Sequence, residues 1–405
     1  MTKKVSTPAL RFKGFTYTWE QRKLGEVGET YTGLSGKTKD DFGHGNGKFV
    51  TYMNVFTNTV GLSDMTEAVE IDDSQNKVRF GDVLFTTSSE TPEEVGMSSV
   101  WLGSSENIYL NSFCFGYRPT INFDLYYLAY MLRSSSMRKK ITFLAQGISR
   151  YNISKNKMMD IEIPIPPIEE QKQIGSYFRN LDRLITLHQH KYDKLTNMKK
   201  SMLEKMFPKN GANVPEIRFK GFTDAWEQRK LGELALFNPK DELPQIFEYV
   251  DLESVVGTEM LSHRTEVKSS APSRAQRLAH TGDLFYQTVR PYQKNNYLFE
   301  KPDNNYVFST GYAQMRPYVD GYFLLSLVQS ERFVKVVLDN CTGTSYPAIN
   351  ANDLAEIEVA APSDESEAQK IGTIFRSIDN LITLHQRELE KLKNFKKACL
   401  EKMFV

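Results

Sequence analysis

The chain contains two segments that each occur twice, and this duplication restricts what it can fold into. The first pair is "RFKGFTYTWEQRKLGE" from Arg11 and "RFKGFTDAWEQRKLGE" from Arg218. The second is "IGSYFRNLDRLITLHQ" from Ile174 and "IGTIFRSIDNLITLHQ" from Ile371. We name these repeat A and repeat B, and the order is A, a unique segment, B, and then the same again. Internal repeats decide an architecture, so one framework must hold two different unique segments.

Repeat B predicts a long coiled-coil helix. In both copies the apolar positions step by four and three residues over more than four heptads, which is the pattern of a coiled-coil seam. Because A and B alternate, each unique segment leaves on an equivalent helix. We therefore predict that the two helices pack antiparallel, with the unique segments in a pseudo-twofold arrangement. The seam residues are Ile174, Phe178, Leu181, Ile185, His188, Tyr192 and Leu195, and in the second copy Ile371, Phe375, Ile378, Ile382, His385, Leu389 and Leu392.

Polar residues interrupt the seam at equivalent places, His188 with His385 and Lys199 with Lys396. They either extend outward to solvent or fix the register and the choice of partner at some cost in stability. A second apolar line flanks the seam, and it either docks other subunits or covers the chain's own domains. This line consists of Leu184, Leu187 and Leu203, and of Leu381, Leu384 and Leu400.

Length and composition favour a soluble protein of at least two domains, with 405 residues, 40% hydrophobic and 25% charged. No apolar run is long enough to span a bilayer, and the N-terminus lacks the apolar core of a signal peptide. Three isolated cysteines favour a reducing cytoplasm and give no metal framework. The net charge is +1, which excludes a globally basic nucleic-acid binder. Residues 174–207 and 371–405 together carry +7, so the rest of the chain carries −6.

The unique segments, residues 27–160 and 234–361, each predict short strands and one amphipathic helix. They share a skeleton, in which "GDVLF" corresponds to "GDLFY", "GYRPT" to "QMRPY", and "GISRYNI" at Gly147 to "GTSYPAI" at Gly343. We therefore predict one α+β fold that carries two different surfaces. Residues 208–215, "PKNGANVP", predict a short linker between the halves.

The sequence contains no complete catalytic motif. There is no phosphate-binding glycine loop of the P-loop type, and no serine or histidine stands in a nucleophile-elbow context. "NPKD" at Asn238 resembles the Asn-Pro-Pro-aromatic motif of amino-methyltransferases only superficially, because no glycine-rich cofactor loop accompanies it. The loops "TTSSETPEEVG" and "TVRPYQKNNY" carry residue types that suit contacts to base edges. The alternative is that these loops are solvated hairpin tips.

The whole chain resembles the specificity subunit of type I restriction-modification systems. "WEQRKLGE" at Trp19 and Trp226 resembles the segment that leads into each target-recognition domain of that family. "GDVLF" and "GISRYNISKNKMMDIEIPIPPIEEQKQI" resemble its internal strand and its exit into the conserved helix. One departure is "VAAPSDESEAQKI" from Val359, where the family usually has a proline-rich exit like that at Pro164. This departure concerns how the second domain joins its helix.

The resemblance implies an α+β protein with two similar target-recognition domains joined by two long antiparallel helices. It implies a non-catalytic, cytoplasmic chain that reads a bipartite, asymmetric target in double-stranded DNA and does not bind membranes. Two modification (methyltransferase) subunits and, in the full complex, restriction subunits are the implied partners, and they would hold S-adenosylmethionine, ATP and Mg. The expected divisions are a first target-recognition domain at 1–167, a helix at 168–207, a linker at 208–216, a second target-recognition domain at 217–365 and a helix at 366–405.

Position predicts which residues bind DNA. The two loops fall at equivalent places in the shared skeleton, yet their sequences differ, as two readers of different bases require. For the residues of the "GISRYNI" and "GTSYPAI" segments, the alternative is that they only stabilise the turn before the last strand. The predicted DNA-binding residues are Thr87, Ser88, Ser89, Arg150 and Tyr151 in the first domain, and Arg290, Tyr292, Gln293, Lys294, Ser345 and Tyr346 in the second.

Two other functions compete with this interpretation. One is a stand-alone DNA methyltransferase or nuclease, which would transfer methyl groups or cut DNA by itself. The other is a coiled-coil scaffold without DNA specificity. The duplication with divergent inserts favours a reader of two half-sites over both.

Overall fold

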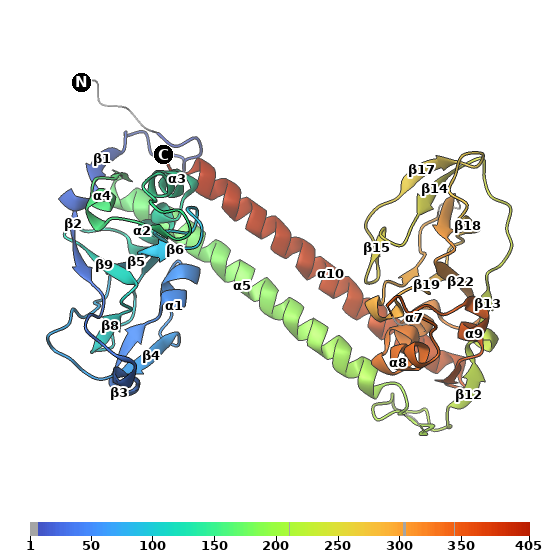
Figure 1. Ribbon diagram of the computed structural model, residues 1–405. Coiled ribbons are helices and arrows are strands. Elements are labelled where there is room, and N and C mark those ends of the chain that lie inside the picture. The colour runs from blue at the N-terminus through green and yellow to red at the C-terminus, as the bar shows by residue number, and fades with distance from the viewer. Residues whose placement is uncertain (1–6, 210, 303–304, 344) are drawn as a thin grey trace. The chain divides into compact units, whose positions relative to one another are not determined.

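A computed structural model describes residues 7–405 except 210, 303, 304 and 344. The chain divides into two compact units, unit 1 (Met1–His188 with Arg387–Val405) and unit 2 (Gln189–Gln386). The two longest helices, α5 (Ile168–Lys205) and α10 (Glu365–Lys402), each contribute residues to both units (green and red in Figure 1).

Unit 1 combines a four-stranded and a three-stranded sheet with short helices. The first sheet has the order β2 (Gly28–Thr32), β9 (Cys114–Pro119), β5 (Val83–Thr86), β7 (Ser98–Val100). The second has the order β4 (Thr66–Val69), β3 (Phe42–Val50), β8 (Ile108–Leu110), in which β3 and β8 run parallel. Two further pairs are β1 (Glu20–Lys23) with β11 (Glu162–Ile165), and β6 (Ser88–Ser89) with β10 (Tyr151–Asn152). The short helices are η1 (Leu24–Glu26), η2 (Lys39–Asp41), α1 (Tyr52–Thr57), α2 (Leu125–Leu132), α3 (Ser135–Phe143) and α4 (Lys155–Met159).

Unit 2 repeats this plan with two four-stranded sheets. Their orders are β13 (Ala235–Phe237), β22 (Tyr312–Pro317), β19 (Leu284–Gln287), β20 (Tyr297–Leu298), and β17 (Arg264–Val267), β14 (Ile246–Val250), β21 (Tyr306–Ser309), β18 (Ala275–Leu278). The pairs are β12 (Glu227–Lys230) with β23 (Glu358–Ala361), and β15 (Val255–Val256) with β16 (Glu259–Met260). The short helices are α6 (Leu231–Leu234), η3 (Pro291–Gln293), α7 (Gly321–Gln329), α8 (Glu331–Asp339) and α9 (Ala351–Ala355). The predicted α+β class with two similar domains is confirmed.

The shared "GDVLF" and "GDLFY" strands are buried on both faces. Val83 and Phe85 of β5 pack into the cluster formed with α2 and α5, whereas Leu84 packs into the cluster that includes β8. Alternate residues of a strand point to opposite faces, so this strand separates a helix-covered layer from the second sheet. In unit 2, Leu284 and Phe285 of β19 divide between two clusters in the same way.

A glycine in each B repeat lets a short helix approach the long one. The Asp124 carboxylate accepts a hydrogen bond from the Tyr127 amide at 2.8 Å and caps α2, and a Cβ at Gly175 would lie 2.2 Å from its Oδ1. Asp320 caps α7 likewise, 1.8 Å from where a Cβ at Gly372 would lie. Real Cβ atoms do not come this close to other atoms, so the "IG" at the start of each B repeat is explained by packing.

The long helices run antiparallel within each unit. In unit 1, the Tyr177 hydroxyl lies 3.6 Å from Cys399 Sγ, and Asp182 pairs with Lys396, so residue numbers rise on α5 as they fall on α10. In unit 2, Lys199 Nζ lies 2.6 Å from Asp379 Oδ1, while Phe207 stacks on Phe375 with centroids 6.1 Å apart. The predicted antiparallel pairing is confirmed.

The predicted seam residues are all buried or half-buried. The two lysines that interrupt the seam do not simply point into solvent. Each forms an ion pair with an aspartate of the other long helix. Both aspartates stand in repeat B, and the two pairs, Asp182–Lys396 and Asp379–Lys199, join equivalent positions. These contacts favour the interpretation that the lysines fix the register.

Repeat A folds onto the first turn of the long helix that carries repeat B, through a buried glutamate. Glu170 accepts hydrogen bonds from Arg11 Nε at 2.6 Å and from Trp19 Nε1 at 3.0 Å. Glu367 is bound in the same way by Arg218 Nε at 2.7 Å and Trp226 Nε1 at 3.1 Å. The unusual exit from Val359 therefore changes nothing at this junction, since α10 begins at Glu365 and still presents the glutamate.

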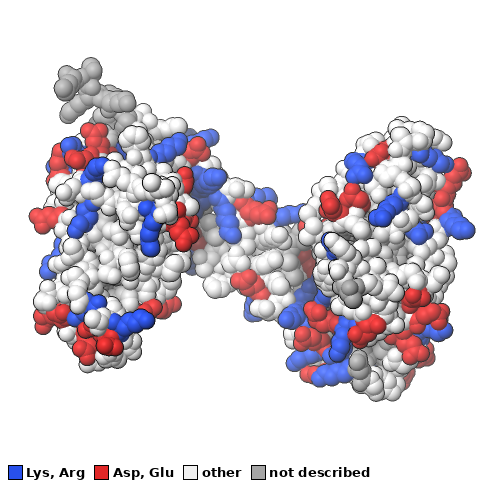
Figure 2. Space-filling view, viewed as in Figure 1, with Lys and Arg blue, Asp and Glu red and all other residues white. Residues whose placement is uncertain are grey.

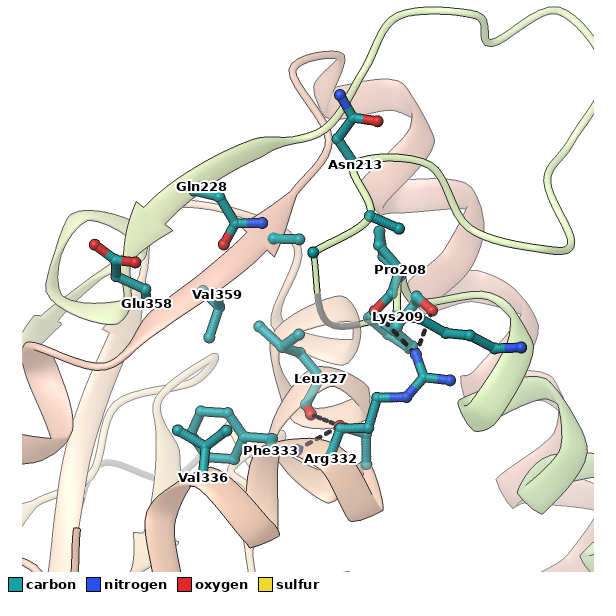
Figure 3. A pocket seen from close by; sticks show the side chains of 15 residues that line it. Pro208, Lys209, Asn213, Gln228, Leu327, Arg332, Phe333, Val336, Glu358 and Val359 are labelled. Atoms are coloured by element: carbon teal, nitrogen blue, oxygen red, sulfur yellow. Dashed lines mark hydrogen bonds between the residues drawn. The ribbon is translucent and has the colours of Figure 1, made fainter. Parts of the chain in front are cut away.

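The end of α5 is fixed in unit 2 by one arginine. Arg332 Nη1 donates to the carbonyl oxygens of Phe207 and Pro208 at 2.8 and 2.9 Å (Figure 3). Its Nη2 donates to the carbonyl oxygen of Glu204 at 2.6 Å. Carbonyls at a helix C-terminus lack partners within the helix, and a cation there is favourable. A hollow of about 520 Å³ lies beside this contact, between the linker, β12, β23 and α8.

Candidate nucleic-acid interface

The structure joins the two predicted segments of unit 1 into one surface. β6 and β10 pair antiparallel, with Tyr151 opposite Ser89 and Asn152 opposite Ser88. The Ile153 amide then donates to the Thr87 carbonyl at 3.0 Å. Segments separated by about sixty residues therefore meet at one edge, where the strand containing "GDVLF" ends.

The predicted side chains at this edge differ in exposure. Ser88 and Ser89 are only 5% and 7% exposed, and Ser89 Oγ donates to Glu94 Oε2 at 3.1 Å. Thr87 Oγ1 donates to the Phe113 carbonyl at 2.6 Å. Arg150 is exposed, whereas Tyr151 is half-buried. Arg150 is therefore the most exposed of the predicted residues at this edge.

A hollow of about 280 Å³ adjoins Arg150 and Ser89. Sequence reasoning did not identify its other lining residues. The Tyr52 and Phe56 rings stack 5.9 Å apart, and the Tyr52 hydroxyl donates to the Ser88 carbonyl at 2.7 Å. Burial raises the pKa of Tyr52 above its ordinary value. The remaining lining residues are Met53, Glu90, Glu94 and Phe113.

Only one weak signal in the sequence could have indicated this hollow. "YMNVF" from Tyr52 comes directly after β3 and forms α1, and its exposed Met53 is an apolar residue outside the core. A short helix has too few turns to show a clear apolar stripe. The distant Glu94 and Phe113 reach the hollow only through the tertiary fold.

Unit 2 has the same junction with different side chains. The Ile349 amide donates to the Thr288 carbonyl at 3.0 Å, as Ile153 does to Thr87 in unit 1. Val289 bridges to Ala348, and the Arg290 amide donates to the Pro347 carbonyl at 2.8 Å. Arg290 thus occupies the place that Ser89 has in unit 1.

Arg290 and Tyr346, predicted on separate loops, are in contact. The Arg290 guanidinium carbon lies 4.5 Å from the centroid of the Tyr346 ring, and that ring is 63% exposed. Arg290 has φ 55° and Lys294 has φ 56°, values that are uncommon for residues other than glycine. The loop between them is the η3 turn, which begins at the buried Pro291.

The other predicted residues of unit 2 are placed as follows. Tyr292 and Ser345 are exposed. Gln293 Oε1 accepts a hydrogen bond from Gln287 Nε2 at 2.8 Å, and Lys294 Nζ lies 2.7 Å from Glu331 Oε1. Thus Gln293 and Lys294 already have partners within the unit, and Lys294 would have to leave a carboxylate to reach DNA.

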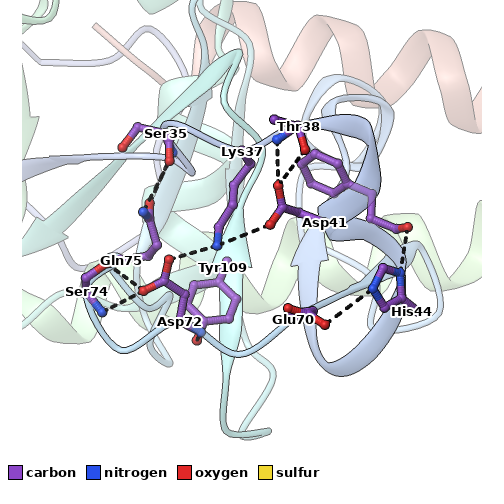
Figure 4. Close-up of polar contacts among 11 residues, drawn as sticks. Ser35, Lys37, Thr38, Asp41, His44, Glu70, Asp72, Ser74, Gln75 and Tyr109 are labelled. Carbon is purple, nitrogen blue, oxygen red and sulfur yellow. Dashed lines mark hydrogen bonds and ion pairs between the residues drawn. The ribbon is translucent and has the colours of Figure 1, made fainter.

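A separate polar cluster in unit 1 lies outside the predicted site. Lys37 Nζ lies 2.8 Å from Asp72 Oδ2 and 3.9 Å from Asp41 Oδ1 (Figure 4). The Tyr109 hydroxyl accepts a hydrogen bond from the Asp72 amide at 2.9 Å. The Asp72 carboxylate is hydrogen-bonded by Lys37 and, with a smaller effect, by Ser74. These bonds hold the pKa of Asp72 below its usual range. These contacts tie η2 to the segment after β4, and we assign the cluster a structural role.

The surface charge is mixed. Figure 2 shows Lys and Arg intermingled with Asp and Glu over the visible face of each unit. Within the described part of the chain, no group of three or more His, Cys, Asp or Glu side chains is arranged to hold a metal ion. Among the helices of those residues, none is long and apolar enough to cross a bilayer.

Comparison with known proteins identifies relatives over most of the chain. A family model described as "Type I restriction modification DNA specificity domain" matches residues 17–197 and 262–394. The type I restriction enzyme MjaVIII specificity subunit of Methanocaldococcus jannaschii is 25% identical over 368 residues, covering 82% of this chain and 80% of that protein. A protein of the same organism, provisionally named the MjaX specificity subunit, is 23% identical over 409 residues and 94% of this chain, covering 92% of its own length.

Solved structures agree on the fold. The crystal structure of a type I restriction-modification system S subunit from M. genitalium has a TM-score of 0.60 at 16% identity, covering 99% of both chains. A second structure, titled as the basis of complex assembly and conformational transition of the type I R-M system, has a TM-score of 0.51 at 20% identity. It covers 94% of this chain and 96% of its own.

Proposed function

The chain belongs to the type I restriction-modification DNA specificity family, and on that premise we propose that its two units read the two halves of a bipartite, asymmetric DNA target. One observation carries the proposal. The same backbone junction bears Ser89 and Arg150 in unit 1, but Arg290 and Tyr346 in unit 2. A constant scaffold with different polar side chains at one point suits the recognition of two different base sequences.

In this proposal the chain itself is not catalytic. Two modification subunits would methylate the DNA with S-adenosylmethionine, and restriction subunits would use ATP and Mg to translocate and cut it. The chain would act in the cytoplasm, where it and its partners meet double-stranded DNA. Partner subunits would also supply phosphate contacts, since the chain's own net charge is only +1 and phosphate contacts dominate affinity.

Exposed apolar residues of the long helices support docking of two like partners. In unit 1, Leu184 and Leu187 of α5 are exposed, as is Phe395 of α10. Their counterparts in unit 2, namely Leu381, Leu384 and Met198, are exposed as well. Apolar side chains at equivalent positions in both units fit two copies of one partner, which we assign to the two modification subunits.

The test is an exchange of one recognition segment. Residues 27–160 are replaced by the equivalent segment of another family member, and methylated adenines are mapped in cells that contain the partner subunits. We expect one half-site to change while the other is retained. A change in both half-sites, or methylation without a sequence motif, would overturn the proposal. The reciprocal exchange of residues 234–361 is the matched control, and it should change only the other half-site.

A further inference from the structure

We propose that Arg290 reads a guanine in the half-site of unit 2, and that Tyr346 is the positioning residue that holds it for this purpose. This inference rests on the proposed function and adds the identity of one base to it. It also divides two residues, both predicted as DNA contacts, into one that touches a base and one that acts through the other.

The backbone of Arg290 is held in an unfavourable conformation. Its φ of 55° and ψ of 56° are left-handed, and a following proline restricts the preceding residue further. Two hydrogen bonds maintain this conformation, since the Arg290 amide donates to the Pro347 carbonyl at 2.8 Å and the Arg290 carbonyl accepts from the Gln293 amide at 3.0 Å. Backbone strain of this kind clusters at functional sites, where the surroundings fix a side chain in advance.

The side chain of Arg290 is held without being neutralised. Its guanidinium lies over the Tyr346 ring at 4.5 Å, an attraction that uses the face of the ring. Among the described residues, no carboxylate forms an ion pair with Arg290. By contrast, Lys294 of the same loop pairs with Glu331, and Arg316 of the same unit pairs with Asp283. The N–H groups of Arg290 therefore remain available to an external acceptor.

The chemistry of this group selects guanine among the bases. In the major groove, guanine presents the two acceptors O6 and N7, which match the fork of an arginine. The same fork also fits a phosphate, but a phosphate contact carries no sequence information. Arg290 stands where unit 1 has Ser89, and a side chain that differs between two readers of different sequences fits a base contact better than a phosphate contact.

The experiment uses the full chain assembled with its modification subunits and duplexes that contain the mapped target. Each guanine of the unit 2 half-site is replaced in turn by 7-deazaguanine, which lacks N7, or by inosine, which keeps N7 and O6. We expect one guanine whose replacement by 7-deazaguanine weakens binding and whose replacement by inosine does not. The Arg290→Ala variant should lose about 10- to 100-fold of its preference for that base pair, and its binding should no longer respond to 7-deazaguanine.

Further variants distinguish the loss of base recognition from misfolding and from a change of charge. Arg290→Lys keeps the charge but not the fork, so it should lower the preference for guanine while the salt dependence of binding stays unchanged. Tyr346→Phe should behave as the parent chain, because the ring face is retained. Tyr346→Ala should lower the guanine preference, whereas Tyr318→Ala, which removes a ring that is also 63% exposed, should not.

Two results would overturn the inference while leaving the proposed function intact. One is a parent complex that methylates a defined motif but tolerates 7-deazaguanine at every guanine of that half-site. The other is an Arg290→Ala complex that binds all sequences more weakly to the same degree, which identifies a phosphate contact. If the proposed function were wrong, the results would differ from both of these. The parent complex would methylate no defined motif, or exchange of one recognition segment would change both half-sites.

Discussion

Lys199 Nζ lies 2.6 Å from Asp379 Oδ1, so a lysine in the seam of α5 is neutralised by an aspartate of α10. Lys396 and Asp182 make the equivalent contact in unit 1. Both side chains of the Lys199 pair are mostly buried. Removing one partner of such a pair leaves a charge without compensation, and this makes the seam lysines informative sites for mutation.

We expect Lys199→Met to destabilise unit 2 by about 1–3 kcal/mol, since it leaves Asp379 unpaired. Burial raises the pKa of Asp379, and Lys199 opposes this rise. A carboxyl whose folded pKa is raised contributes stability below its unfolded pKa of about 3.9 and loses it as pH rises through the folded pKa. The deficit should therefore be largest near neutral pH and shrink as the pH falls toward 4.

Urea unfolding of the parent and variant at several pH values measures this deficit. The double variant Lys199→Met with Asp379→Asn is the control, and it should recover most of the loss because no unpaired charge remains. A deficit that does not depend on pH would contradict the electrostatic explanation.

The buried glutamates should be essential to the junction between repeats A and B. Glu170→Ala leaves Arg11 and Trp19 without their acceptor, and we expect a loss of about 3–5 kcal/mol, as for a broken buried ion pair. Trp19 and Trp226 donate to the two glutamates, and they are two of the three tryptophans of the chain. Tryptophan fluorescence during unfolding is therefore a direct measurement, and Glu367→Ala should have a matching effect in unit 2. Equal stability of parent and variant would show that the glutamate is dispensable.

Gly175→Ala offers a test in which local and tertiary effects have opposite signs. Alanine is favoured over glycine within a helix by about 1 kcal/mol. The new Cβ would, however, lie 2.2 Å from Asp124 Oδ1, and displacing this cap should cost about 1–3 kcal/mol. We expect a net decrease in thermal stability, measured by calorimetry. Ser176→Ala, at an exposed neighbouring position, is the control, and a stabilised Gly175→Ala chain would refute the close approach.

In unit 1 we expect Arg150, rather than Ser88, to be the sensitive residue. Arg150→Ala should cost about 1–3 kcal/mol of binding and relax one position of the unit 1 half-site. Ser88 is only 5% exposed, so Ser88→Ala should leave the motif unchanged. Methylation mapping with each variant measures both outcomes. A unit 2 half-site altered by Arg150→Ala would contradict the assignment of one half-site to each unit.

Local sequence patterns were sufficient to predict the two long helices and the shared fold of the two unique segments. The four-three spacing predicted α5, α10 and their seam, because a helix must turn its apolar residues to one side. The shared strand motifs predicted that the two unique segments have one fold. The positions of Arg290 and Tyr346 in that skeleton predicted two loops of interest, and their roles on DNA stay predictions.

By itself, then, the sequence determined the duplicated architecture, since periodicity and repetition are properties of neighbouring residues. Only the tertiary structure decided which side chains are available. It paired Ser89 with Glu94, paired Lys294 with Glu331, and set Arg290 on Tyr346. The last two contacts join residues more than thirty positions apart, and burial and partner choice depend on such approaches, which no local pattern encodes.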